Sequence, residues 1–123
     1  MGKITDYTAI EKYILSKEGS YKDFPFGPEA VVYKVCNKMF ALMNPDNGIP
    51  RLNLKCDPDD AEVLRSIFDA VKPGYHMNKR HWNSVYLDGS ISEGAICQMI
   101  DDSYDLVVKR LKKSERVNLH KMK

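Results

Sequence analysis

The amino-acid sequence predicts a single α+β domain, with helices packed on an antiparallel sheet. The chain has 123 residues, which is about the length of one domain. Hydrophobic residues make up 43% and charged residues 29%, as in globular and not in disordered proteins. Segments with a helical period are separated by short strand-like runs, and the expected element order is α-βββ-α-ββ-α.

The first half of the chain predicts a helix followed by three strands. The helix is expected from Asp6 to Lys17, with Thr5 or Asp6 as its N-cap. Two prolines and a glycine make residues 20–28 irregular. Three aromatic side chains of this segment are expected to anchor in the core: Tyr21, Phe24 and Phe26. Strands are expected at 30–36, 39–43 and 51–56, with Asn37-Lys38 as the first turn, and they would form an antiparallel meander.

The second half predicts a helix, two strands and a final helix. Asp57-Pro58 is typical of a helix start, and the buried face of that helix is expected to consist of Ala61, Leu64, Ile67 and Phe68. Strands are expected at 75–77 and 82–87. Ser90 and Glu93 have the spacing of a capping box, and the last apolar helix face continues to Leu111. Alternation leaves Trp82 with two interpretations, an exposed stacking platform or a core residue, of which the core is favoured.

Charge is distributed unevenly along the chain. Residues 1–108 carry a net charge of −4 and residues 109–123 carry +6. We therefore expect one domain at 1–111 and a basic C-terminal tail at 112–123, which is either a contact for nucleic acid or an acidic surface, or a solvated, partly frayed helix end. The span 70–87 contains no acidic residue and combines cations with aromatic and amide side chains. Such a mixture can contact phosphates and stack on bases.

Several classes of protein are not indicated. The longest apolar run, residues 39–43, is far shorter than a membrane span. The N-terminus lacks the apolar region of a signal peptide, and the three cysteines form no C-x-x-C pair, so we expect a cytoplasmic protein with reduced thiols. No nucleotide-binding glycine motif, nucleophile elbow or metal-binding set is present. We therefore expect no enzyme, no metal and no small-molecule cofactor.

Five segments resemble the MmcQ/YjbR family of small bacterial proteins. They are FPFG (24–27), KMFA (38–41), LKC (54–56), GYHMNKRHWN (74–83) and IDDSYDLV (100–107). The resemblance extends from about Tyr21 to Leu111, and its most specific part runs from His76 to Trp82. It implies an α+β fold similar to frataxin-like and secretion-chaperone-like proteins. It also implies DNA binding through a double-wing surface, and it brings no catalytic residues with it.

The leading hypothesis is sequence-tolerant binding of duplex DNA. Lys38 in one turn, with Lys79 and Arg80 in another, would neutralise phosphates from two protruding wings. The residues expected to contact nucleic acid are Lys38, His76, Asn78, Lys79, Arg80, His81 and Trp82. The alternative is a protein-interaction module, such as a homodimer, which would require an exposed apolar patch larger than about 400 Å².

Overall fold

The chain folds into helices packed on an antiparallel sheet, and a computed structural model describes residues 7–75 and 77–121. The helices in this part are α1 (Thr8–Leu15), α2 (Pro58–Ile67), α3 (Glu93–Lys109) and α4 (Lys113–Lys121). The strands are β1 (Tyr21–Asp23), β2 (Val31–Val35), β3 (Lys38–Met43), β4 (Arg51–Lys55), β5 (Val71–Pro73) and β6 (Trp82–Tyr86). They form one sheet in the order β1-β2-β3-β4-β6-β5, and every neighbouring pair is antiparallel. The predicted α+β class is confirmed.

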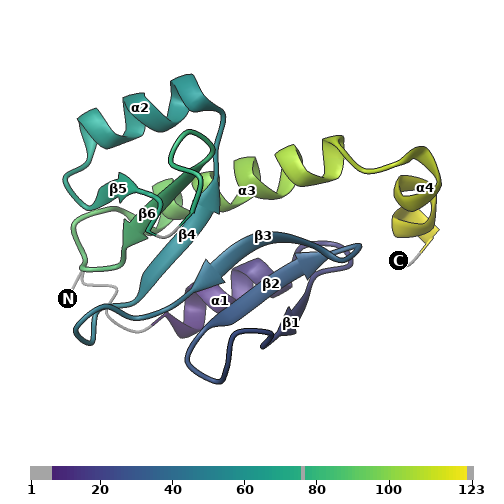
Figure 1. Cartoon of the computed structure of the whole chain (residues 1–123), viewed down its shortest axis with the longest axis horizontal. Coiled ribbons are helices and arrows are strands. Elements are labelled where there is room, and N and C mark those ends of the chain that lie inside the picture. Colours follow the sequence, from purple (N-terminus) through teal and green to yellow (C-terminus); the bar gives the residue numbers. More distant parts are fainter. Residues whose placement is uncertain (1–6, 76, 122–123) are drawn as a thin grey trace.

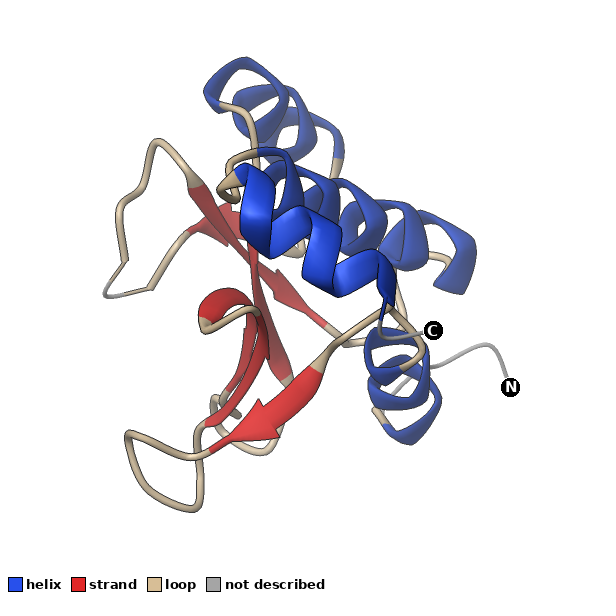
Figure 2. Ribbon diagram, turned by 90° about the vertical axis from the view of Figure 1, so that its right-hand side faces the viewer, coloured by secondary structure: helices blue, strands red, loops and turns tan. Residues whose placement is uncertain are grey.

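The helices gather on one side of the sheet, where α3 crosses β3 and β4 (Figures 1 and 2). The hydrophobic core lies between them, and its largest fully buried side chains include Tyr33, Phe40 and Leu52. The loop between β5 and β6 extends on the other side of the sheet (Figure 2). We call this second side the open face. It is the side on which loops, and not helices, approach the strands.

Element boundaries follow the predictions where local chemistry decides them. The N-cap of α2 is Asp57, whose side chain accepts a hydrogen bond from the Asp59 backbone N–H at 3.1 Å. The β2–β3–β4 meander is also confirmed. The turn between β2 and β3 consists of Cys36 and Asn37, which both have positive φ, as a two-residue hairpin turn requires. Lys38 is consequently the first residue of β3, not part of the turn.

Three helix starts or ends differ from the predictions. α1 begins at Thr8, after a Tyr7 N-cap without a side-chain hydrogen bond, whereas Thr5 and Asp6 lie outside the described residues. The cap of α3 is Ser92, because the hydroxyl of Ser90 instead donates to Asp88 at 2.6 Å. The segment expected as a tail contains α4. Its Leu119 is buried beside Gly19, at which a Cβ atom would overlap the leucine side chain.

Two short edge strands and several side chains were mispredicted. β1 lies in a segment expected to be irregular, and β5 precedes the expected strand at 75–77, of which residues 75 and 77 belong to no strand and residue 76 lies outside the described residues. Tyr21, Phe24 and Phe26 are exposed and not in the core, because they belong to an edge strand and to the loop that follows it. Ile67 is also exposed, since α2 covers only the β5–β6 edge and buries Ala61.

An ionic contact fastens α1 to α3. The carboxylate of Asp101 accepts a hydrogen bond from the Tyr13 hydroxyl at 2.6 Å and forms an ion pair with Lys17. Partial burial alone would raise the pKa of Asp101, but the hydrogen bonds from Lys17 and Tyr13 outweigh it and hold the pKa below the usual value. A lowered carboxyl pKa stabilises the fold above the pKa of the unfolded chain, and this stabilisation is lost as the pH falls.

We therefore expect Asp101→Asn to flatten the acid limb of the stability curve. The free energy of unfolding of the parent chain should fall more steeply than that of the variant below about pH 4, where an unfolded aspartate becomes protonated. Urea denaturation between pH 3 and pH 7 measures this. Asp102→Asn, on the neighbouring residue, is the matched control and should retain the steep acid limb. An equally steep limb in Asp101→Asn would contradict the assignment.

Candidate nucleic-acid interface

Three strand ends with basic or aromatic residues meet at one end of the sheet. β4 pairs with β3 as far as Ala41 and Leu54, and with β6 as far as Lys55 and Trp82. Because these strands are antiparallel, the beginning of β3, the end of β4 and the beginning of β6 lie at the same end. The predicted residues Lys38 and Trp82 are thus at this end, together with Lys55, which was not among the predicted residues.

A hollow of about 280 Å³ opens at the end of the sheet where β3 and β4 continue beyond their last pair. We call it the basic pocket; it is lined by Lys38, Met39, Lys55, Val107, Arg110 and Leu111. Half of these residues are cationic and none is acidic. Within the part of the chain that the structure describes, no carboxylate forms an ion pair with Lys38, Lys55 or Arg110. The pocket therefore concentrates positive charge that no described carboxylate neutralises directly.

A buried serine holds the elements of the basic pocket together. The hydroxyl of Ser103 on α3 donates to the Phe40 carbonyl at 2.5 Å and accepts from the Lys55 backbone N–H at 2.9 Å. This bridge joins α3 to β3 and to β4 at the level of the pocket. Arg110 follows as the C-cap of α3, where the helix dipole favours a positive charge.

The electrostatics of the pocket favour an anion. The pKa of Lys55 is lowered by burial and by the positive charge of Arg110. Both causes act against the charged form of the lysine, and a bound anion would oppose both. A phosphate is a suitable anion because lysine and arginine are its usual protein partners.

An acidic hollow limits the interface on the other side of α3. Asp57 and Asp60 of the α2 start and Asp102 and Asp105 of α3 line a hollow of about 230 Å³. These residues face the α2 side of α3, whereas the basic pocket lies on the β3 side. Within residues 7–75 and 77–121, no three His, Cys, Asp or Glu side chains are placed to hold a metal ion. The acidic hollow would repel a polyanion and confine it to the β3 side.

The loop between β5 and β6 supplies further positive charge. Lys79 and Arg80 are exposed, and neither forms an ion pair with a described carboxylate. The ammonium group of Lys79 donates to the Gly74 carbonyl at 3.0 Å, and Arg65 of α2 donates to the Lys79 carbonyl. The loop that carries these two cations is therefore held by one hydrogen bond to the residue that follows β5 and by another from α2.

Two further residues predicted to contact nucleic acid, Asn78 and His81, do not line the basic pocket. The backbone carbonyl of half-buried His81 accepts from the Cys56 N–H at 2.8 Å and so attaches the loop to the end of β4. The side-chain oxygen of exposed Asn78 accepts from the Arg80 N–H at 2.9 Å. His76 lies outside the described residues.

Trp82 lines a second hollow, on the open face. Its volume is about 430 Å³, and we call it the aromatic groove; it is lined by Phe26, Ala30, Met39, Leu42, Asn44, Tyr75, Met77, Asn78 and Trp82. Trp82 is half-buried, so the favoured interpretation of this residue as core is wrong. Met39 lines both the groove and the basic pocket, which places the two hollows next to each other.

A buried polar network supports one wall of the aromatic groove. Arg51 and Asn53 of β4 are buried, although alternation predicted a half-exposed strand. The side-chain oxygen of Asn44 accepts from Arg51 Nε at 3.2 Å and from Asn53 Nδ2 at 3.0 Å. The guanidinium of Arg51 lies 4.0 Å from the ring centroid of Tyr75. Arg51 and Asn53 could have indicated this network from the sequence, because two polar residues in a central strand require hydrogen-bond partners.

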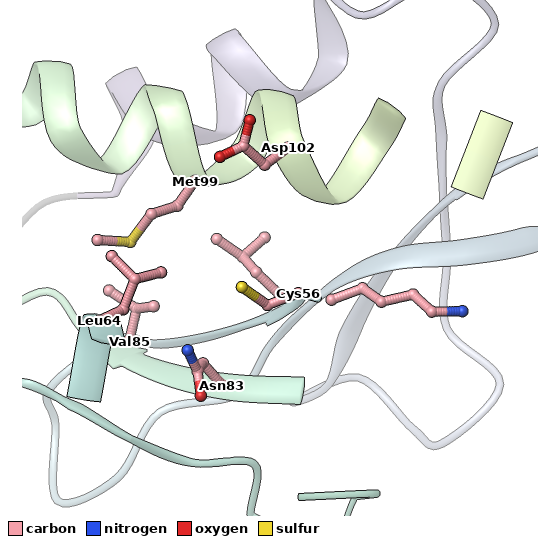
Figure 3. Close-up of a pocket in the computed structure, with 8 residues that line it drawn as sticks. Cys56, Leu64, Asn83, Val85, Met99 and Asp102 are labelled. Atoms are coloured by element: carbon pink, nitrogen blue, oxygen red, sulfur yellow. The ribbon is translucent and has the colours of Figure 1, made fainter. Parts of the chain in front are cut away.

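The cavity between α3 and the sheet is too small for a ligand. Figure 3 shows a cavity between α3 and the strands, with Cys56, Leu64, Val85 and Met99 around it. Its volume is about 10 Å³, which is room for a single water. Burial, followed by the charge of nearby carboxylates, raises the pKa of the Cys56 thiol to about 11. The thiol is therefore protonated at neutral pH and is a poor nucleophile.

None of the helices in the described residues is both long enough and apolar enough to cross a bilayer.

Comparison with protein families matches residues 15–106 to the YjbR family. Protein YbdF of Escherichia coli O157:H7 is 45% identical over 93 residues, which cover 76% of each chain. Protein YjbR of Escherichia coli K12 is 34% identical over 105 residues, which cover 85% of this chain and 89% of that protein. The crystal structure of Deinococcus radiodurans protein DR2400 superposes with a TM-score of 0.87 at 33% identity, over 95% of this chain and 89% of that one. The resemblance noted in the sequence is thus confirmed, and the chain belongs to the YjbR family.

Proposed function

We propose that the protein binds duplex DNA through backbone phosphates at the basic end of its sheet. The observation that supports this most directly is the basic pocket, in which Lys38, Lys55 and Arg110 surround a hollow without a lining carboxylate. Lys79 and Arg80 are exposed in the loop that leads into β6, and β6 begins at this same end of the sheet. Contacts from lysine and arginine to phosphates position a protein on DNA without reading its sequence. Sequence-tolerant binding is therefore the form of recognition that we propose.

The arrangement refines the two-wing hypothesis. One contribution comes from the start of β3, where Lys38 lines the basic pocket with Lys55 and Arg110, and the other comes from the β5–β6 loop. Lys55 is half-buried and Arg110 is exposed, and both would contact phosphates in the pocket. The acidic hollow on the α2 side of α3 would keep the duplex on the β3 side.

The proposal predicts strong salt dependence. With about five phosphate contacts, the logarithm of the binding constant should fall with the logarithm of salt concentration at a slope of about −4 to −5. Fluorescence anisotropy of a labelled duplex between about 50 and 300 mM salt measures this slope. A slope near zero, or no association at about 50 mM salt, would contradict the proposal.

A second candidate function is protein interaction through α2. Val63 and Ile67 are 52% and 62% exposed, and they lie one helical turn apart. Large aliphatic side chains exposed on one helix face are typical of a contact surface. The mass of the chain in solution tests whether this surface forms a homodimer, and a monomer mass would contradict that form of the proposal.

A further inference from the structure

We propose that the aromatic groove binds an unpaired nucleobase of the DNA strand whose phosphate occupies the basic pocket. The inference rests on the proposed function and adds to it. Phosphate contacts alone do not distinguish paired from unpaired strands, whereas a base can enter a groove only when it is unpaired. The protein would then prefer single strands, or duplexes with unpaired bases, to fully paired DNA.

The walls of the groove suit a planar ring. Phe26 is 69% exposed, Tyr75 is 47% exposed and Trp82 is half-buried, and all three side chains line the groove. Aromatic side chains on an exposed sheet face are the usual stacking surface for single-stranded nucleic acids. A volume of about 430 Å³ also lies within the range of small-molecule sites, roughly 300–1,000 Å³.

Two amide groups give the groove a polar preference. The side-chain oxygen of Asn44 accepts from Arg51 and Asn53, and that of Asn78 accepts from the Arg80 N–H. Because both oxygens are engaged by donors, each amide has its NH₂ group left to offer. Among the described residues neither NH₂ group has an acceptor. The carbonyl oxygens and ring nitrogens of a base are acceptors of the required kind.

The neighbouring charge selects the class of occupant. Met39 lines both the groove and the basic pocket, so a planar ring in the groove and an anion in the pocket would both contact this residue. A nucleotide unit has both groups joined by a sugar. Tyr75 is already packed on the guanidinium of Arg51, and a ring held in place before binding loses little freedom on binding.

Two phenylalanines of one loop provide the variant and its matched control. Phe26 lines the groove, whereas Phe24, two residues earlier, does not, and both side chains are exposed. Neither Phe26→Ala nor Phe24→Ala should disturb the core. The probes are a twelve-nucleotide single strand of thymidines, a strand of equal length made of abasic nucleotides, and a twelve-base-pair duplex. Trp82 is the single tryptophan of the chain, so its fluorescence reports on the groove directly.

We expect the thymidine strand to quench Trp82 fluorescence and to bind about tenfold more tightly than the abasic strand. Phe26→Ala should lower affinity for the thymidine strand about five- to tenfold and leave affinity for the duplex and the abasic strand unchanged. Phe24→Ala should behave as the parent chain with all three probes.

The outcomes separate this inference from the proposed function. Equal binding of thymidine and abasic strands, without quenching, would overturn the base site and leave phosphate binding intact. Absence of binding to all three probes would overturn both. If the chain is a dimer that Phe26→Ala converts to a monomer, the groove is a protein contact and the base site is wrong.

Discussion

Replacing Lys55 and Arg110 together by glutamine is expected to lower the affinity for duplex DNA about 100-fold at 50 mM salt. The two side chains line the basic pocket, and each contributes one proposed phosphate contact. Loss of two contacts should reduce the salt slope by about 1.8 and remove the corresponding counterion-release free energy. Anisotropy of a labelled duplex, titrated at several salt concentrations, gives both quantities.

The matched control removes two positive charges elsewhere. Lys12 on α1 and Lys22 on β1 line none of the hollows at the basic end, so Lys12→Gln with Lys22→Gln changes the net charge equally. This control should bind duplex DNA within about threefold of the parent, because neither side chain lines the basic pocket and Lys22 is already paired with Glu11. An equal loss of affinity in both double variants would show that only net charge matters, and the basic pocket would then not be the binding site.

Unfolding is a separable explanation for a loss of binding in the pocket variant. The lowered pKa of Lys55 means that the folded chain disfavours its positive charge, which burial and Arg110 both oppose. Glutamine at position 55 should therefore leave the free energy of unfolding unchanged or raise it, whereas glutamine at position 110 loses only the helix-dipole contribution of about 0.3–1 kcal/mol, so the double variant should change little. Urea denaturation of the double variant checks this, and a marked destabilisation would contradict the electrostatic description of the pocket.

Local chemistry explains which parts of the fold could be predicted. Asp57 and Pro58 mark the start of α2 because a cap and a fixed φ act within a few residues. β1 and β5 have three residues each, and they exist because a neighbouring strand pairs with them. Strand preference depends strongly on such context, so these two strands could not be recognised from their own residues.

Some residues of the candidate site could likewise be predicted from local sequence, and others depend on how distant segments pack. The exposure of Lys79 and Arg80 could be expected, because unpaired cations remain in water. Lys55 and Arg110 are 55 residues apart in the sequence, and only the packing of α3 on β4 through Ser103 brings them to one pocket. Phe26 was expected in the core because of its chemistry, but its loop places it on the open face.

The largest effect on stability is expected for Phe40→Ala. Phe40 is fully buried in the core, and its ring meets that of Tyr104 edge to face at a centroid distance of 5.2 Å. Removing the ring should lower the free energy of unfolding by about 3–5 kcal/mol, because apolar contacts are lost and a cavity remains. Urea denaturation, followed by circular dichroism, measures this change.

Phe26→Ala is the same chemical change at an exposed position and should alter the free energy of unfolding by less than about 0.5 kcal/mol. The contrast tests the division of the molecule into a helix-covered core and an open face. Phe40 also lies beside the Ser103 bridge that holds α3 over Lys55. A folded Phe40→Ala chain should therefore bind duplex DNA more weakly, as α3 and Arg110 lose their fixed position. Similar losses of stability at Phe40 and Phe26 would contradict the assigned core, and with it the rigid support that the basic pocket requires.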